Sequence, residues 1–162
     1  MLQARFTLHV PQIPLTDPQQ AAQVADAVLY PAVEEATLLA WREIHDNTPV
    51  GATAVLRGSV QQAVEVLRGT SVQFRGRVET AQPYAAAVEF GTRPHWAPIG
   101  PLKLWAKRML GDEEAAYRVR WAIARRGTRP QRFFARGVEA ATGRVLAILR
   151  RAGQEFAARL RR

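Results

Sequence analysis

The side chains that most often carry catalytic or metal chemistry are few in this chain and scattered along it. The three histidines, His9, His45 and His95, fall on a predicted strand, a helix end and a loop, and none has a second histidine or a carboxylate at metal-ligand spacing. Surface or locally bonded histidines are therefore the favoured interpretation. The chain has no cysteine, which excludes disulfides, thiol catalysis and zinc–thiolate sites.

The acidic residues form no predicted pair of catalytic carboxylates. Glu34 and Glu35 are neighbours in the sequence, as are Asp112, Glu113 and Glu114, and adjacent residues do not face one another across a cleft. The sequence contains neither a G-x-S-x-G motif nor a phosphate-binding loop. We therefore expect a protein that is not an enzyme, with no catalytic residues, no metal ligands and no cofactor.

Aromatic side chains offer a second kind of chemistry, the stacking of rings on nucleic-acid bases or on a partner protein. Four tryptophans are candidates: Trp41, Trp96, Trp105 and Trp121. Three of them fall on predicted helices, where packing in the core is favoured. Trp96 instead lies in a loop beside Arg93 and His95, and an aromatic residue next to a cation is a typical interface anchor. A loop pinned to its own domain is the equally compatible alternative.

The charge of the chain points to acidic partners. The net charge is +9, from 23 basic and 14 acidic residues, which suits DNA, an acidic protein surface or a membrane surface, or simply a solvated basic face. Arginines cluster at residues 150–151 and 159–162, where they could contact phosphate or favour the end of a helix. No apolar run is long enough to span a membrane, and no signal peptide is recognised.

Periodicity along the chain predicts one α+β domain over residues 1–162. Residues 3–10 and 60–78 have the alternation of strands, the latter as a hairpin turning near residues 68–69 with a bulge at Ala63 and Val64, and residues 54–80 as a whole are assigned to the sheet. A long helix precedes them and ends before Thr48, with a kink or restart at Pro31. Residues 83–90 favour a short helix.

The second half of the chain is predicted to be helical. Residues 91–130 form a segment of loop and helices, with a loop over 91–100, a helix over 101–110 and another ending near Arg126 before Gly127. Residues 131–162 form the C-terminal helix, which needs a surface to pack on. Gly137, Gly143 and Gly153 weaken it by about 1 kcal/mol each relative to alanine.

Three segments together resemble one family. Residues 48–59 (TPVGATAVLRGS) are similar to its TPV-x-TG-x-LR-x-S stretch, residues 83–92 (PYAAAVEFGT) to its YA-x-x-VE-x-GT, and residues 127–134 (GTRPQRFF) to its PQPFF. The family is that of the tail-completion and head–tail joining (neck) proteins of long-tailed bacteriophages, including the minor tail protein Z type. The chain departs from the pattern at Ala52-Thr53-Ala54, which alters a turn, and at Arg132, which replaces a proline and loosens the approach to the last helix.

The resemblance implies a small, mainly antiparallel sheet packed on a long N-terminal helix, with additional helices and a long C-terminal helix. It also implies a structural virion protein without catalysis, which forms an oligomeric and commonly hexameric ring at the head-proximal end of the tail. Its partners would be other neck and tail proteins, such as the connector, the tail terminator or the tail tube. DNA would pass through the ring without sequence-specific binding, and no membrane would be involved. Such a protein is assembled in the host cytoplasm and located in the virion.

The candidate interface residues follow from loop position and motif. They are Glu89, Arg93, His95, Trp96, Arg129 and Phe133. Four further motif residues are expected to fix the local fold: Tyr84, Phe90, Gly91 and Thr92. The alternative function is a basic nucleic-acid-binding module, which would bind DNA with an affinity that falls steeply with salt.

Overall fold

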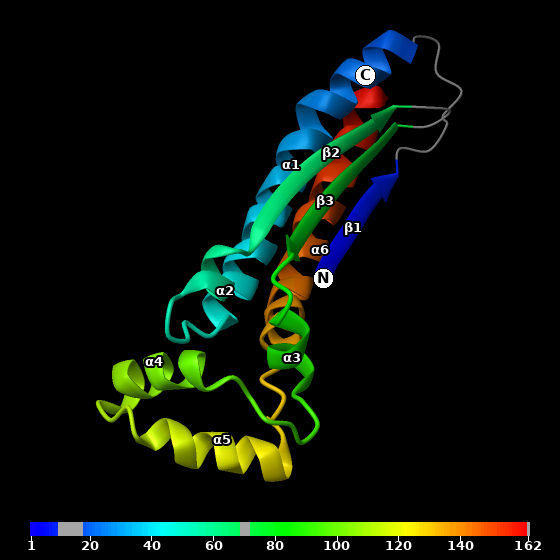
Figure 1. The fold of residues 1–162 in the computed structure, drawn as a ribbon. Coiled ribbons are helices and arrows are strands. Elements are labelled where there is room, and N and C mark those ends of the chain that lie inside the picture. Colours follow the sequence, from blue (N-terminus) through cyan, green and yellow to red (C-terminus); the bar gives the residue numbers. More distant parts are fainter. Residues whose placement is uncertain (10–17, 69–71, 162) are drawn as a thin grey trace.

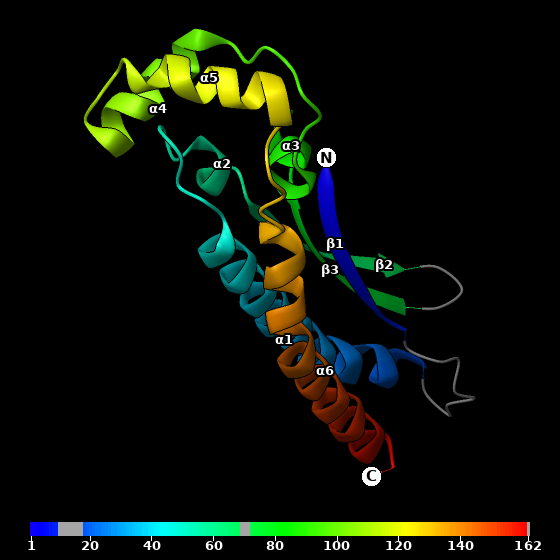
Figure 2. The same cartoon turned by 90° about the horizontal axis from the view of Figure 1, so that it is seen from below.

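A three-stranded sheet, two long helices and a separate pair of helices make up the α+β fold (Figure 1). The computed structural model describes residues 1–9, 18–68 and 72–161. The sheet lies on one side of the two long helices, and the helix pair stands at one end of this body (Figure 2). The predicted fold class is confirmed.

The sheet contains β1 (Leu2–His9), β2 (Gln61–Arg68) and β3 (Val72–Thr80) in the order β1-β3-β2, and every pairing is antiparallel. The predicted hairpin of β2 and β3 is confirmed, whereas its turn falls outside the described residues. The pairing runs without interruption from Gln61↔Glu79 to Arg68↔Val72, so the predicted bulge is wrong. Along β3, Phe74, Gly76 and Val78 are buried while Arg75 and Arg77 between them are half-buried, as the alternation predicted.

The long helices α1 (Pro18–Asn47) and α6 (Phe133–Leu160) pack along each other and cover the apolar face of the sheet (Figures 1 and 2). Pro31 lies inside α1, which continues through it as one helix and bends (Figure 2); proline lacks the N–H that the helix interior requires. At Gly137 the helix α6 lies close against α1, since a Cβ there would lie 2.5 Å from Ile44 Cα. This glycine therefore permits the helix contact, in addition to its cost in helix propensity.

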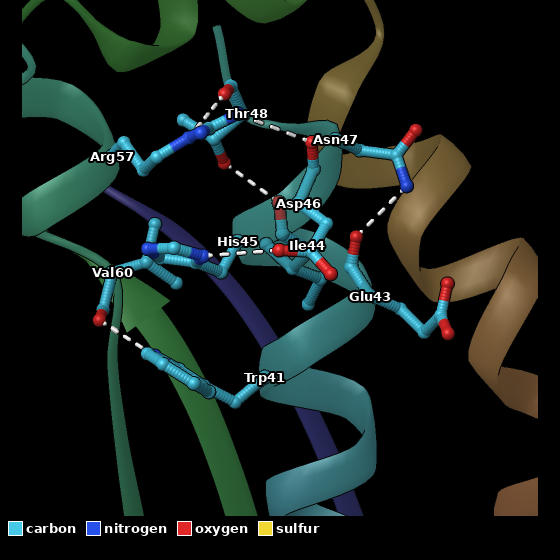
Figure 3. A network of polar contacts seen from close by, with 9 residues as sticks. All are labelled: Trp41, Glu43, Ile44, His45, Asp46, Asn47, Thr48, Arg57 and Val60. Carbon is cyan, nitrogen blue, oxygen red and sulfur yellow. Dashed lines mark hydrogen bonds and ion pairs between the residues drawn. The ribbon is translucent and has the colours of Figure 1, made fainter. Parts of the chain in front are cut away.

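The first motif segment caps the C-terminal end of α1 (Figure 3). The Thr48 hydroxyl donates to the Ile44 carbonyl at 2.7 Å, and the Arg57 guanidinium donates to the Thr48 and Asp46 carbonyls at 2.9 and 3.3 Å. These bonds satisfy carbonyls that the end of a helix leaves without partners. Arg57 belongs to the short helix α2 (Val55–Gly58), so the assignment of residues 54–80 to the sheet is wrong at its start.

Three further helices complete the chain: α3 (Ala85–Phe90), α4 (Ile99–Leu110) and α5 (Ala115–Arg126). The short helix predicted for residues 83–90 and the two helices predicted within residues 91–130 are confirmed. Helices α4 and α5 pack on each other around Ala106, Ala115 and Ala116, in an apolar cluster separate from the two clusters of the body. We call residues 93–127 the lobe and the rest of the fold the body.

Candidate interaction surface

The lobe begins and ends at a single antiparallel contact between Thr92 and Thr128. The backbone N–H of each threonine donates to the carbonyl of the other at 3.2 Å, and the two hydroxyl oxygens lie 3.1 Å apart. Between these residues the chain leaves the body and returns to it, and it contacts the body again where the Arg108 guanidinium of the lobe donates to the Ala52 carbonyl. The position of the lobe is therefore set at both contacts, and the side chains beside the threonine pair are well placed to act at an interface.

The two sides of this contact have the same sequence, because Gly-Thr-Arg-Pro occurs at residues 91–94 and again at residues 127–130. Gly91 and Gly127 have φ of 74° and 71°, a region that side chains disfavour. A Cβ on Gly127 would lie 1.8 Å from the Thr92 carbonyl oxygen, so only glycine allows the two segments to meet. This repeated tetrapeptide, which the sequence prediction did not use, is the signal that could have predicted the pairing. Gly91 and Thr92 both take part in the contact.

Glu89 was expected at an interface and is instead buried inside the body, with 3% of its surface exposed. Its carboxylate accepts hydrogen bonds from the backbone N–H of Phe134 at 2.8 Å and of Ala135 at 3.0 Å. These are free donors in the first turn of α6, where a negative charge is favoured by the helix dipole. The expected interface role of Glu89 is therefore corrected: it joins α3 to α6 within one chain.

The expected interface role of Phe133 is corrected in the same way, because this residue is fully buried in the core of the body. The opposite correction applies to Phe90 and Tyr84, which were expected to fix the fold but are 68% and 43% exposed. Helix α3 turns Glu89 inward, and Phe90, its neighbour in sequence, points to the surface. The candidate interface thus gains two aromatic residues of the second motif and loses two buried ones.

Arg132 was expected to loosen the segment that leads into α6. In the structure this segment is instead held by backbone hydrogen bonds to α3. The backbone N–H of Gln131 donates to the Val88 carbonyl at 2.9 Å, and that of Arg132 to the Glu89 carbonyl at 3.1 Å. Arg132 has φ of 49°, which a proline ring cannot adopt because it fixes φ near −65°. The departure from the family pattern at this position is required by the local backbone.

The expected surface position of Trp96 is confirmed, and its partner is one that the sequence analysis assigned to the core. Trp96 and Trp121 are 59% and 60% exposed, and their rings meet edge to face with centroids 5.7 Å apart. The Arg120 guanidinium lies over the Trp96 ring, 5.2 Å from its centroid. Trp121 fell on a helical pattern, but the lobe is too thin for α5 to bury both of its faces.

The other candidates near the base of the lobe are also exposed. Arg93, His95 and Arg129 all lie at the surface, and His95 Nδ1 lies 2.9 Å from the Arg93 carbonyl oxygen. The structure thus brings Arg93, His95 and Trp96 together on one side of the Thr92–Thr128 contact, with Arg129 directly after it. Four of the six expected interface residues keep a position that an interface can use.

The outer face of α5 extends this surface. A shallow hollow runs along it, lined by aromatic, arginine and alanine side chains: Tyr117, Arg118, Trp121, Ala122, Arg125 and Arg126. Tyr117, Trp121 and Arg125 are spaced by four residues and therefore share a face of the helix. We call this set, with Trp96 and Arg120, the arginine–tryptophan face.

Lys103 of α4 contacts the start of α5 beside that face. Its ammonium lies 3.3 Å from the Glu113 carboxylate and 5.4 Å from the centroid of the Tyr117 ring. The hydrogen bond to Glu113, followed by that to Tyr117, raises the pKa of Lys103. Both contacts join α4 to the start of α5, so they keep Tyr117 in place.

Charge divides the molecule. The lobe contains eight lysines and arginines and three acidic residues, a net charge of +5 out of +9 for the chain. Helix α1 contains five acidic residues and one arginine, a net charge of −4. The remaining residues of the chain carry a net charge of +8, so α1 is an acidic element in an otherwise basic protein and the lobe is one of its basic parts.

No group of three histidine, cysteine or acidic side chains that could hold a metal ion occurs among the described residues. His45 stacks on Trp41 with ring centroids 4.8 Å apart and lies 3.3 Å from the Asp46 carboxylate (Figure 3). The side chain of His9 lies outside the described part. No described helix is long and apolar enough to cross a membrane.

Comparison with known proteins adds no relative. No family model, no curated protein and no solved structure matches the chain.

Proposed function

We propose that this protein is a structural subunit of a long-tailed bacteriophage, forming an oligomeric ring at the head-proximal end of the tail that completes the tail or joins it to the head. The proposal needs a rigid body, an exposed contact surface and no catalytic cleft. The body with its projecting lobe has the first two features.

One observation carries the proposal: the three motif segments, which are far apart in the sequence, meet at the end of the body that holds the lobe (Figures 1 and 2). Leu56, Ala85 and Phe133, one from each segment, belong to the same buried cluster. The second and third segments are joined by Glu89 and by the Thr92–Thr128 contact. Segments that match a family in order and also form one structural unit support the resemblance more than separate matches would.

The residues of this chain that resemble the first motif have structural roles of the same kind. Thr48 and Arg57 finish α1, and the Ser59 hydroxyl lies 2.7 Å from the Thr80 hydroxyl at the end of β3. Leu56 is buried in the shared cluster. These residues connect the sheet to the long helices at the base of the lobe. The motif residues therefore lie where the lobe is attached to the body. We expect related ring subunits to share this attachment.

The test combines assembly in solution with assembly in the particle. We expect light scattering on the purified protein to give a mass several times that of the 18.0 kDa chain, and electron micrographs to show closed rings. In the parent phage, loss of the gene should leave heads and tails unjoined or tails without a defined end. Neighbouring genes for a portal and connector on one side and a tail tube on the other would agree with this. A protein that stays monomeric and is absent from particles and assembly intermediates would refute the proposal.

A further inference from the structure

A groove on the body has the charge opposite to that of the lobe. It lies between α1 and the edge strand β2, has a volume of about 410 Å³, and is lined by seven residues: Tyr30, Glu34, Glu35, Leu38, Gln62, Ala63 and Val64. Leu38, Ala63 and Val64 are half-buried and give it an apolar floor, while Glu34 and Glu35 are exposed at its rim. We call it the acidic groove.

No lysine or arginine is among the described residues that line the acidic groove. Elsewhere on α1, Asp26 pairs with Arg68 and Glu43 with Arg144, so those acids are matched within the chain. Glu34 is hydrogen-bonded to Tyr30, whose pKa is raised first by this bond and then by the charge of Glu34. Glu35 is exposed and also lines a second hollow, between α1 and α6, that contains Arg151. Neither carboxylate meets a cation within the groove itself, so both can accept one from an outside partner.

The arginine–tryptophan face, in contrast, contains arginines without acidic partners among the described residues. Arg125 and Arg126 are exposed and form no ion pair with any described residue. Arg120 is stacked on Trp96, and its Nε is buried without a hydrogen-bond partner in the described part. Stacked arginines hold a planar donor array that pairs well with carboxylates. Trp121 and Tyr117 present apolar area between these cations, as the centre of an interface does.

The two surfaces are remote from each other within one chain. Helix α5 lies at the lobe end, and the part of α1 that lines the groove lies along the middle of the body beside β2 (Figures 1 and 2). One copy therefore does not satisfy its own groove. Two different surfaces that fit each other connect copies head to tail, and such contacts close into a ring when the rotation between copies allows it.

We propose that the arginine–tryptophan face of one copy docks into the acidic groove of the next copy of this chain. Arg125 and Arg126 pair with Glu34 and Glu35, and Trp121 covers the apolar floor formed by Leu38, Ala63 and Val64. This inference rests on the proposed ring-forming function and names the two surfaces that would make the ring. It commits to a second copy because the chain itself supplies both charges.

The experiment is a charge swap, read out by sedimentation velocity over a range of protein concentrations and salt. One variant reverses the lobe (Arg125→Glu with Arg126→Glu), one reverses the groove (Glu34→Arg with Glu35→Arg), and a third combines all four changes. The matched control, Arg150→Glu with Arg161→Glu, changes the net charge as the lobe variant does at exposed positions outside the lobe. Circular dichroism verifies that each variant is folded.

We expect each double variant to weaken self-association roughly 100-fold, because it places like charges against each other across the interface. The fourfold variant should restore self-association, because opposite charges then face each other again. The control should associate like the wild type. Double variants that associate normally would overturn this interface and leave the ring proposal intact, as would a fourfold variant that stays dissociated. If the fourfold variant associates again but the wild-type protein is absent from phage particles, the interface is supported and the proposed function is refuted.

A short DNA duplex tests the remaining alternative occupant of the lobe. If the wild type binds it in low salt, stays monomeric throughout, and loses the binding only when Arg125 and Arg126 are reversed, the lobe contacts nucleic acid and the proposed docking is wrong. We expect any DNA affinity of the lobe variant and the control to fall equally, since both lose the same charge.

Discussion

The Glu89 carboxylate accepts a 2.8 Å hydrogen bond from the backbone N–H of Phe134, a residue 45 positions further along the chain. The connection encloses the whole lobe, because the chain leaves α3 at one end of it and returns to α6 at the other. Only 3% of Glu89 is exposed, so its charge is balanced by the first turn of α6 rather than by solvent. This buried contact joins α3 to α6, the two elements from which the chain enters and leaves the lobe.

Replacing Glu89 by glutamine should destabilise the fold by about 2 kcal/mol, because the charge at the helix N-terminus is lost and one buried N–H is left without an acceptor. Urea denaturation followed by circular dichroism measures the free energy of unfolding. The matched control is Glu139→Gln, which breaks only an exposed ion pair with Arg132 and should cost less than about 0.5 kcal/mol. An E89Q protein of normal stability but impaired assembly would instead return Glu89 to the interface.

Gly127→Ala should destabilise the lobe more than Gly111→Ala. Both glycines have φ near 70°, but a Cβ at Gly111 would meet nothing within 4 Å whereas one at Gly127 would collide with the Thr92 carbonyl. The strained backbone alone costs about 1–2 kcal/mol, and the collision should add about 1–3 kcal/mol. Urea denaturation gives the totals, and limited proteolysis locates the loss. Equal stabilities for the two variants would contradict the close contact.

Ala54→Gly should stabilise the protein by roughly 0.5–1 kcal/mol. Ala54 has φ of 56°, a left-handed conformation that costs alanine about 1–2 kcal/mol. Glycine avoids this cost, but part of the gain is offset because glycine loses more conformational entropy on folding. The control in the same loop is Ala52→Gly, where φ is not positive and a loss of about 0.5–1 kcal/mol is expected. Thermal denaturation compares the two, and a destabilised A54G protein would show that the turn differs from the one described.

Arg132→Pro would match the family pattern and should nevertheless destabilise the protein by about 3 kcal/mol or more. Proline cannot adopt φ of 49°, and it would remove the N–H that binds the Glu89 carbonyl. Arg132→Gly keeps both features and is expected to be neutral or stabilising by up to about 1 kcal/mol. Chemical denaturation of the two variants decides this; an R132P protein as stable as R132G would mean that the approach to α6 follows another path.

The contribution of Lys103 to stability should be present at neutral pH and lost in strong alkali. Its folded-state pKa is raised above 10.5 by Glu113 and Tyr117, so the protonated form is favoured by folding. The stabilisation is complete below the unfolded pKa and disappears as the pH rises through the folded pKa. Unfolding curves of wild type and Lys103→Met, measured from neutral pH upward, should therefore converge above pH 10.5. A constant difference would assign the effect of the mutation to packing.

Local patterns in the sequence determined most of the elements. The alternation around Phe74 and Val78 predicted β3, the repeated apolar positions from Phe134 to Phe156 predicted α6, and Gly127 correctly marked the end of α5. These features depend on neighbours within a few residues, so one chain is enough to recognise them. The same patterns also gave the α+β class, because an amphipathic sheet and two amphipathic helices must bury their apolar faces together.

Tertiary structure decided which candidate residues are accessible. Glu89 and Phe90 are adjacent in the sequence, yet one is buried against the start of α6 and the other is exposed; the helix phase and a partner 45 residues away settle this, and neither can be read from α3 alone. Trp121 has the spacing of a core residue but is exposed because α4 and α5 form a lobe with little behind it. The distance between the basic lobe and the acidic part of α1 is likewise set by the fold, since the sequence alone does not place α5 and α1 at different parts of the molecule.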